Sequence, residues 1–387
     1  MGKIWTSRER VEAALNHQEP DRVPMDITIR KIPYERLRDY LGLPQEETKG
    51  NRFGEVSPSL DVLKALRIDM TFIKLRKPSN WTAPPPTEDD ILFDAWGVGH
   101  KEVKVPGAGV LLEPVVSPLK DFEPNEIDLD AYPWPDPTDP GFVAGLADDA
   151  RKFYKETEIA LMGRFGGTIM EQAAFIRGYE KWMMDLVLYP EFAMDLMNRI
   201  TDIQIALDEA GIREAGKYLS IFKLSGEDLG AQERPLFSKR VWQNVLRPIL
   251  KRRWQAARDA LDKYDAAHVK LLLHSDGAIR RFLPDLIEDG VDGIDPVQVQ
   301  CTGMEAVALK QDFGDKLFFH GAIDTQKILP FGTPDDVRTE TKRIIQALAP
   351  GGGFILTPMH NVQPDVSPEN LVAMCEAVKE FGVYPIQ

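Results

Sequence analysis

The chain has 387 residues, longer than most single domains but within the range of a one-domain α/β barrel, and 43% of them are hydrophobic, enough for a large core. Its formal charge of −14 argues against nucleic acid or an anionic membrane surface as a partner. No apolar run approaches the roughly 18 residues of a membrane-spanning helix, and the start has no apolar signal core. Because two cysteines, Cys301 and Cys375, cannot build a disulfide framework, we expect a cytoplasmic protein.

A helix is predicted first, because Thr6 to Glu9 reads TSRE, a capping box. Short β-rich runs then alternate with longer amphipathic segments, the pattern of parallel strands joined by crossover helices. Thr333 before Pro334, and Ser367 before Pro368, mark two of the helix starts. The predicted strands are residues 23–30, 69–76, 159–167, 217–226, 268–277, 291–298, 316–324 and 352–360.

Eight strands with their crossovers predict one (β/α)8 TIM barrel over residues 1–387, with an N-terminal helical extension at its bottom or side. The exception is the proline-rich stretch 77–140 after the second strand, which contains strand-like pieces. So long a non-helical insertion is expected to be a hairpin-bearing lid or rim rather than a separate domain.

Polar residues gather toward the carboxyl ends of the predicted strands or just after them. In this fold the active site lies at the carboxyl-terminal rim of the barrel, so these side chains are expected to share one face. Three of the six histidines in the chain fall in this set, which a chance distribution would not produce. The main members are Arg30, Arg164, Glu227, Asp228, His274, Asp276, Asp295, His320, His360 and Asn361.

Each of these residues also has a purely structural interpretation. Asp228 and Asp276 lie shortly before presumed crossover helices and could serve as helix caps. Arg30 could pair with a neighbouring acid, and Arg164 could pair with Glu227. The structural interpretation does not explain why three histidines occupy one rim.

Nearly the whole chain resembles the uroporphyrinogen decarboxylase superfamily. The likeness lies in TSRERVEAALNHQEPDRVPMD, DAWGVG, YPWPDP, GEDLG, HSDGAIRRFLPDLIEDGVDGIDPVQ, FGDKLFFHGAIDTQ and PGGGFILTPMHNVQPDVSPENL. The resemblance implies a (β/α)8 barrel, in agreement with the strand count.

The superfamily has a decarboxylase branch, which removes acetate carboxyl groups from a tetrapyrrole without a cofactor. Those enzymes resemble this chain at His360, but their arginine-rich propionate clamp and pyrrole-binding aspartate are missing from MDITIRKIPYERLRDY and IDMTFIKLRKPSNW. A uroporphyrinogen-type decarboxylase is therefore the alternative hypothesis.

The second branch moves methyl groups to or from the cobalt of a corrinoid. Its thiol-specific members hold zinc with a His-x-Cys motif and a distant cysteine in a PGC turn. Here only His274 matches, since Asp276 replaces the first cysteine and PGGG lacks the second. Thiol activation normally uses sulfur-rich zinc sites, so this chain more closely resembles enzymes that demethylate methoxylated compounds, including aromatic ones.

The resemblance implies a methyltransferase that takes a methyl group from a small, O-methylated donor. The chain has no DxHxxG-type corrinoid motif, so the corrinoid would belong to a separate partner protein. A catalytically silent tetrapyrrole or corrinoid carrier is a third hypothesis, and an oligomer is left open.

The roles expected at such a site follow from its chemistry. The leaving oxygen needs a general acid or an N/O-ligated metal such as zinc. His274 and Asp276, joined by His320 or by His360, would hold the metal; without metal, His274 or His360 would donate a proton while Asp276 orients it. The catalytic candidates are thus His274, Asp276, His360 and Glu227, and the substrate-binding candidates are Arg30, Arg164, Asp228, Asp295, His320 and Asn361. Phe165, Trp96 and Phe354 could line an aromatic pocket or merely pack.

Overall fold

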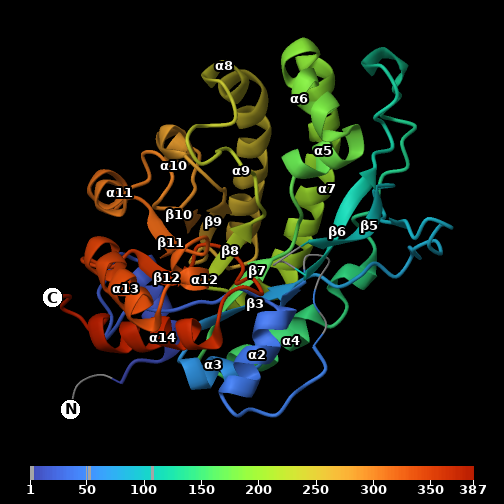
Figure 1. Cartoon of the computed structure of the whole chain (residues 1–387). Coiled ribbons are helices and arrows are strands. Elements are labelled where there is room, and N and C mark those ends of the chain that lie inside the picture. Colours follow the sequence, from blue (N-terminus) through green and yellow to red (C-terminus); the bar gives the residue numbers. More distant parts are fainter. Residues whose placement is uncertain (1–3, 49, 51–53, 106–108) are drawn as a thin grey trace.

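A computed structural model of the chain describes residues 4–48, 50, 54–105 and 109–387 (Figure 1). Within these residues, seven parallel strands form one curled sheet in the order β12-β11-β10-β9-β8-β7-β3. The strands match seven of the eight predicted runs. They are β3 (Met70–Lys74), β7 (Ala160–Arg164), β8 (Ile221–Leu224), β9 (Lys270–His274), β10 (Gly293–Val297), β11 (Phe318–Ile323) and β12 (Phe354–Pro358).

The eighth position of the barrel is filled by an extended segment, residues 23–27, between β12 and β3. Asp26 N–H donates to Leu356 O, Leu356 N–H donates to Pro24 O, and Asp69 N–H donates to Met25 O, each at 2.9 Å. The ladder is interrupted because Met25 N–H donates to the Asp69 carboxylate and Ile27 N–H donates to the Asp26 carboxylate. The barrel is confirmed, but the regular first strand predicted over 23–30 is wrong.

Two short strands follow this segment instead. β1 (Ile29–Arg30) pairs antiparallel with β2 (Glu55–Val56), outside the barrel sheet. The pairing places Arg30 opposite Glu55, which brings residue 55 to the rim of the barrel.

Helix α1 (Ser7–Leu15) closes the bottom of the barrel. The predicted capping box at Thr6 and Glu9 is present. Val11 and Leu15 pack in one buried cluster with residues near the starts of the strands, among them Met70, Ala160 and Ile221. Since the amino-terminal end is sealed by apolar side chains, the opposite end is left for a binding site.

The other helices surround the sheet, and the predicted N-caps Thr333 and Ser367 accept backbone hydrogen bonds at the starts of α13 and α14. No helix in the described part of the chain is both long and apolar enough to cross a membrane. The helices are α2 (Lys31–Tyr40), α3 (Leu60–Leu66), α4 (Leu146–Glu156), α5 (Met170–Arg177), α6 (Tyr179–Leu188), α7 (Pro190–Ala215), α8 (Lys239–Val241), α9 (Arg247–Lys263), α10 (Leu283–Glu288), α11 (Ala306–Phe313), α12 (Ile328–Phe331), α13 (Pro334–Leu348) and α14 (Pro368–Phe381).

The insertion 77–140 contains the predicted hairpin. β5 (Gly99–Val105) pairs with β6 (Gly109–Val116), and β4 (Leu92–Phe93) pairs with the other side of β5. The hairpin projects to one side of the barrel, near α5 and α7 (Figure 1). His100 of β5 packs edge-on against Phe175 of α5, with ring centroids 6.4 Å apart, so the insertion supports α5 from outside.

Candidate functional site

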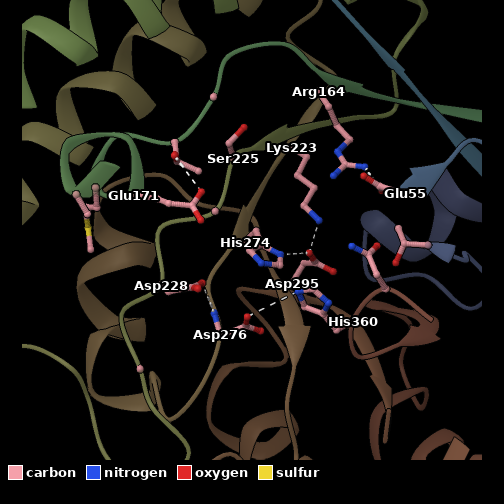
Figure 2. A pocket seen from close by; sticks show the side chains of 18 of the residues that line it. Glu55, Arg164, Glu171, Lys223, Ser225, Asp228, His274, Asp276, Asp295 and His360 are labelled. Atoms are coloured by element: carbon pink, nitrogen blue, oxygen red, sulfur yellow. Dashed lines mark hydrogen bonds and ion pairs between the residues drawn. The ribbon is translucent and has the colours of Figure 1, made fainter. Parts of the chain in front are cut away.

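A cavity of about 600 Å³ lies at the carboxyl ends of the strands (Figure 2). Of the predicted site residues, eight line it: Arg30, Arg164, Asp228, His274, Asp276, Asp295, His360 and Asn361. Glu227 and His320 do not line it, and neither does any described residue of the insertion. The shared rim expected from the sequence therefore exists, with two of its members displaced.

Three of the lining residues form a compact group. His274 is the last residue of β9, Asp276 follows two residues later, and His360 comes two residues after the end of β12. One potential ligand atom from each lies within 4.8 Å of the others. His360 Nε2 is 3.9 Å from Asp276 Oδ2, and the two imidazole centroids are 5.9 Å apart.

Asp295 at the cavity floor connects this group to the barrel interior. Its Oδ2 accepts hydrogen bonds from His274 Nδ1 at 2.7 Å and from the Lys223 ammonium, while its Oδ1 contacts His320 Nδ1. Burial alone would raise the pKa of Asp295, but Lys223 and the two histidines hold it well below its usual value. Asp295 is therefore an anion that fixes the orientation of the His274 ring.

His320 lies beneath the cavity rather than in it. Its side chain is 2% exposed, and its Nε2 is 3.0 Å from Asp26 Oδ2. Burial would lower its pKa, but Asp295 and Asp26 raise it to about 9, so both ring nitrogens carry protons. Because both nitrogens are engaged by carboxylates, the predicted roles of His320 in metal and substrate binding are not supported; His360 takes its place beside His274 and Asp276.

Glu227 also points away from the cavity. Its carboxylate accepts hydrogen bonds from Ile169 N–H at 2.6 Å and Met170 N–H at 2.9 Å, at the start of α5, and lies 4.0 Å from Arg253. Complete burial raises its pKa to about 8, although these donors and Arg253 act in the opposite direction. Glu227 anchors a helix that forms the cavity wall, and the catalytic role expected for it is not supported.

Three charged residues that the sequence analysis did not predict at the site, Glu55, Glu171 and Lys223, also line the cavity. Arg164 Nη1 donates to Glu55 Oε1 at 2.6 Å, not to Glu227, and Lys223 of β8 reaches Asp295. Lys223 is a charged residue inside the predicted strand 217–226, and Glu55 lies in a stretch without a strand pattern, so neither was expected at the rim. Asp228, in turn, lines the cavity and accepts a hydrogen bond from Asp276 N–H.

The three-residue group fits a divalent cation. With Nδ1 committed to Asp295, His274 presents Nε2, and this carboxylate–imidazole arrangement is typical of metal-bound histidines. Asp276 Oδ1 is buried and has no hydrogen-bond partner among the described residues, which leaves it free to bind a cation. Two imidazoles and one carboxylate with space beside them match a zinc site with an open position.

The position of the His274 ring requires a glycine at position 226. A Cβ built there would stand 2.8 Å from His274 Cδ2, closer than side chains tolerate, so any larger residue would push the imidazole away.

The three side chains of the candidate metal group differ in how the protein shifts their pKa values. Burial raises the pKa of Asp276 and lowers that of His360. For His274, burial and Lys223 would lower the pKa, but Asp295 and Asp276 raise it overall.

The aromatic lining differs from the candidates in the sequence. Phe165 stacks on Phe222, Trp96 packs edge-on against Trp134, and Phe354 is fully buried. None of the three predicted rings lines the cavity. Its aromatic wall comes instead from Phe175, Tyr179, Trp182 and Phe237, on α5, on α6 and before α8.

The fold and the cavity define an α/β-barrel enzyme with its site at the carboxyl ends of the strands. Residues 90–381 match the family model described as Uroporphyrinogen decarboxylase (URO-D), so the chain belongs to this family. Curated relatives include the uroporphyrinogen decarboxylases of Magnetococcus marinus, 27% identical over 76% of this chain and 77% of the relative, and of Alkalilimnicola ehrlichii, 24% identical over 75% and 73%.

A solved structure shares the fold over almost the full length. It is described as a methyltransferase from Methanosarcina mazei, and it superposes with a TM-score of 0.65 over 98% of this chain and 99% of its own. The sequence identity is 17%, so this likeness establishes the barrel architecture and leaves the chemistry to the residues of the site.

Proposed function

We propose that this protein transfers a methyl group from a small O-methylated donor, with methoxylated aromatic compounds as the leading class, to the cobalt of a corrinoid carried by a separate protein. The observation that carries the proposal is the convergence of His274, Asp276 and His360 within one cavity. These groups are the types needed where a C–O bond breaks and the oxygen has to be stabilised.

The chemistry sets the requirement on the site. The nucleophilic cobalt supplies the electron pair for the new bond to the methyl carbon, and the ether oxygen keeps the pair of the broken C–O bond and then takes up a proton. A phenol has a pKa of about 10, as in tyrosine, so an unassisted phenolate is a poor leaving group near neutrality. A zinc ion held by His274, Asp276 and His360 would act as a Lewis acid toward that oxygen.

The surrounding residues have defined tasks in this proposal. Asp295 keeps His274 in the tautomer that presents Nε2 to the cavity. Arg30 and Asn361 lie in the cavity wall, where they can bind a polar group such as a carboxylate on the donor, whereas Arg164 is already paired with Glu55. Without a metal, His274 would protonate the leaving oxygen through Nε2, because its pKa is raised whereas that of the neighbouring His360 is lowered.

Decarboxylation of uroporphyrinogen is the second candidate, favoured by the names of the curated relatives. The charges of the cavity are less suited to uroporphyrinogen, a substrate with many carboxylates. Among the residues that the structure describes, its wall contains five carboxylates, Glu55, Glu171, Asp228, Asp276 and Asp295, against three cations, Arg30, Arg164 and Lys223. Arg164 and Lys223 are already paired with Glu55 and Asp295, so a substrate rich in carboxylates would meet little uncompensated positive charge in the described part of the wall.

The experiment is a screen of methyl donors with candidate corrinoid proteins held in the Co(I) state. We expect the visible absorption of Co(I) to disappear only when this protein and a methoxylated compound are both present, and to persist with Asp276→Asn. Co(I) absorption that persists across a broad donor panel would contradict the proposal. Release of carbon dioxide from uroporphyrinogen without cobalt would favour the second candidate.

A further inference from the structure

One part of the cavity is apolar and differs in character from the charged wall. It is built by α5, α6 and the residues before α8, and its members are Ala174, Phe175, Tyr179, Trp182, Leu236 and Phe237. Trp182 and Phe237 are 2% and 5% exposed, whereas Tyr179 is 62% exposed and stands at the entrance. A ligand that fills the whole cavity must therefore have an apolar part as well as a polar part.

The rings of this wall are arranged around a corner. Trp182 and Phe237 meet at an interplanar angle of 84° with centroids 6.2 Å apart, and Tyr179 follows at 6.5 Å from Trp182. A planar ring in this corner can stack on one aromatic face and meet the edge of the other, the two geometries that aromatic pairs prefer. The insertion holds Phe175 in place through His100.

Trp182 also has an unused donor. Its Nε1–H is buried and has no acceptor among the described residues, and buried indole N–H groups usually have one. Because Trp182 lines the cavity, an oxygen on a ligand bound there would supply the missing acceptor if the indole turned toward it. A quaternary ammonium ion, which aromatic faces also attract, has no lone pair to accept it.

We infer that Phe175, Tyr179, Trp182 and Phe237 form a ring-binding subsite that takes one planar aromatic ring with an oxygen acceptor, and that Trp182 donates to this oxygen. The inference depends on the proposed function in one respect only, which is that the bound ring is identified as the ring of the methyl donor. It makes the four residues determinants of substrate specificity, separate from the group formed by His274, Asp276 and His360.

The test uses 4-hydroxybenzoate, which has no methyl group to transfer, and measures its binding by calorimetry without any partner protein. We expect trans-4-hydroxycyclohexanecarboxylate, its saturated counterpart, to bind about 10-fold more weakly because it cannot stack.

Two variants test the residues of the subsite. Phe237→Leu keeps an apolar side chain without the ring, and Trp182→Phe keeps a ring without the N–H. Each is expected to weaken the binding of 4-hydroxybenzoate about 3- to 10-fold. Trp242→Phe is the matched control, since Trp242 is buried outside the cavity and its N–H is bonded to Asp285; binding should not change.

A second measurement follows the indole directly. In the wild-type protein, the indole N–H resonance that is absent from Trp182→Phe should shift downfield when 4-hydroxybenzoate is added. Equal binding of the saturated compound, unchanged affinity in both variants, a stationary resonance, or competition by tetramethylammonium would each overturn the inference. If the probe binds as expected but no donor ever methylates cobalt, the subsite stands and the proposed function fails.

Discussion

Asp295 is the residue through which the barrel interior controls the candidate metal group. One of its oxygens accepts from both His274 and Lys223, and the other contacts His320. We therefore predict that Asp295→Asn lowers the affinity for zinc by about 10- to 100-fold, the range found when a carboxylate behind a metal-binding histidine is lost. Zinc titration against a competing chelator measures the change without any assay of activity.

The controls for this prediction separate ligands from neighbours. His360→Gln removes a proposed ligand and should lower the affinity at least as far as Asp295→Asn. Glu171→Gln changes another carboxylate of the same cavity, outside the group, and should leave zinc affinity as it is. Equal zinc binding by the wild-type protein and His360→Gln would show that these residues do not hold the metal.

The two displaced residues show how far site prediction from a sequence can go. Strand ends can be located only to within a few residues, and one residue of difference decides whether a side chain reaches the rim. His320 is the third residue of β11 and lies inside the barrel, whereas His360 comes after the end of β12 and reaches the cavity. Glu227 follows β8, but the backbone N–H groups of Ile169 and Met170 hold it away from the rim, a long-range contact that no local pattern reveals.

At the scale of single elements, helix α5 depends on Glu227, whose carboxylate accepts two backbone N–H groups at its amino-terminal end. Burial raises the pKa of Glu227 in the folded protein to about 8, above the 4.5 of a free glutamate, so the folded state holds the proton more tightly. The stabilisation from this group is complete below pH 4.5 and is lost as the pH rises through 8. We predict that the wild-type protein loses at least about 1 kcal/mol relative to Glu227→Gln between pH 5 and 8.

Denaturant unfolding of the two proteins at a series of pH values measures this difference. The comparison between them is needed because His320, whose pKa is also raised, to about 9, adds a change of the same sign to both proteins. Parallel curves for the wild-type protein and Glu227→Gln over this range would contradict the assigned role of Glu227.

Seven barrel strands could be predicted because each is a short apolar run with turn residues at its ends, and the capped helices could be predicted because Thr6, Thr333 and Ser367 act locally. The first strand could not be placed correctly, because two of its N–H groups bond to carboxylates instead of to a neighbouring strand. The hydrophobic pattern of the sequence cannot distinguish the two kinds of hydrogen bonding, since residues 23–27 are buried whether they form a regular strand or not.

At the scale of the whole molecule, barrel closure depends on one buried carboxylate. Asp69 is fully buried and accepts hydrogen bonds from Arg10, Arg22 and Met25 N–H, so it ties the amino-terminal segment to the start of β3. We predict that Asp69→Asn costs about 3–5 kcal/mol of stability, because Arg10 and Arg22 would lose a buried partner. Asp149→Asn, which breaks an exposed pair with Arg76, should cost no more than about 1 kcal/mol.

The consequence of Asp69→Asn should also reach the cavity. Thr28 and Arg30 line it and continue directly from residues 23–27, the segment that closes the barrel. Loosening that segment is expected to speed amide hydrogen exchange at residues 23–27 and at their partner Leu356, and to weaken 4-hydroxybenzoate binding, although Asp69 itself lies at the other end of the barrel. If the Asp69→Asn protein is destabilised but these amides still exchange slowly, residues 23–27 are held by β12 alone. The closure of the barrel and the shape of the cavity would then not depend on Arg10 and Arg22 at the bottom of the barrel.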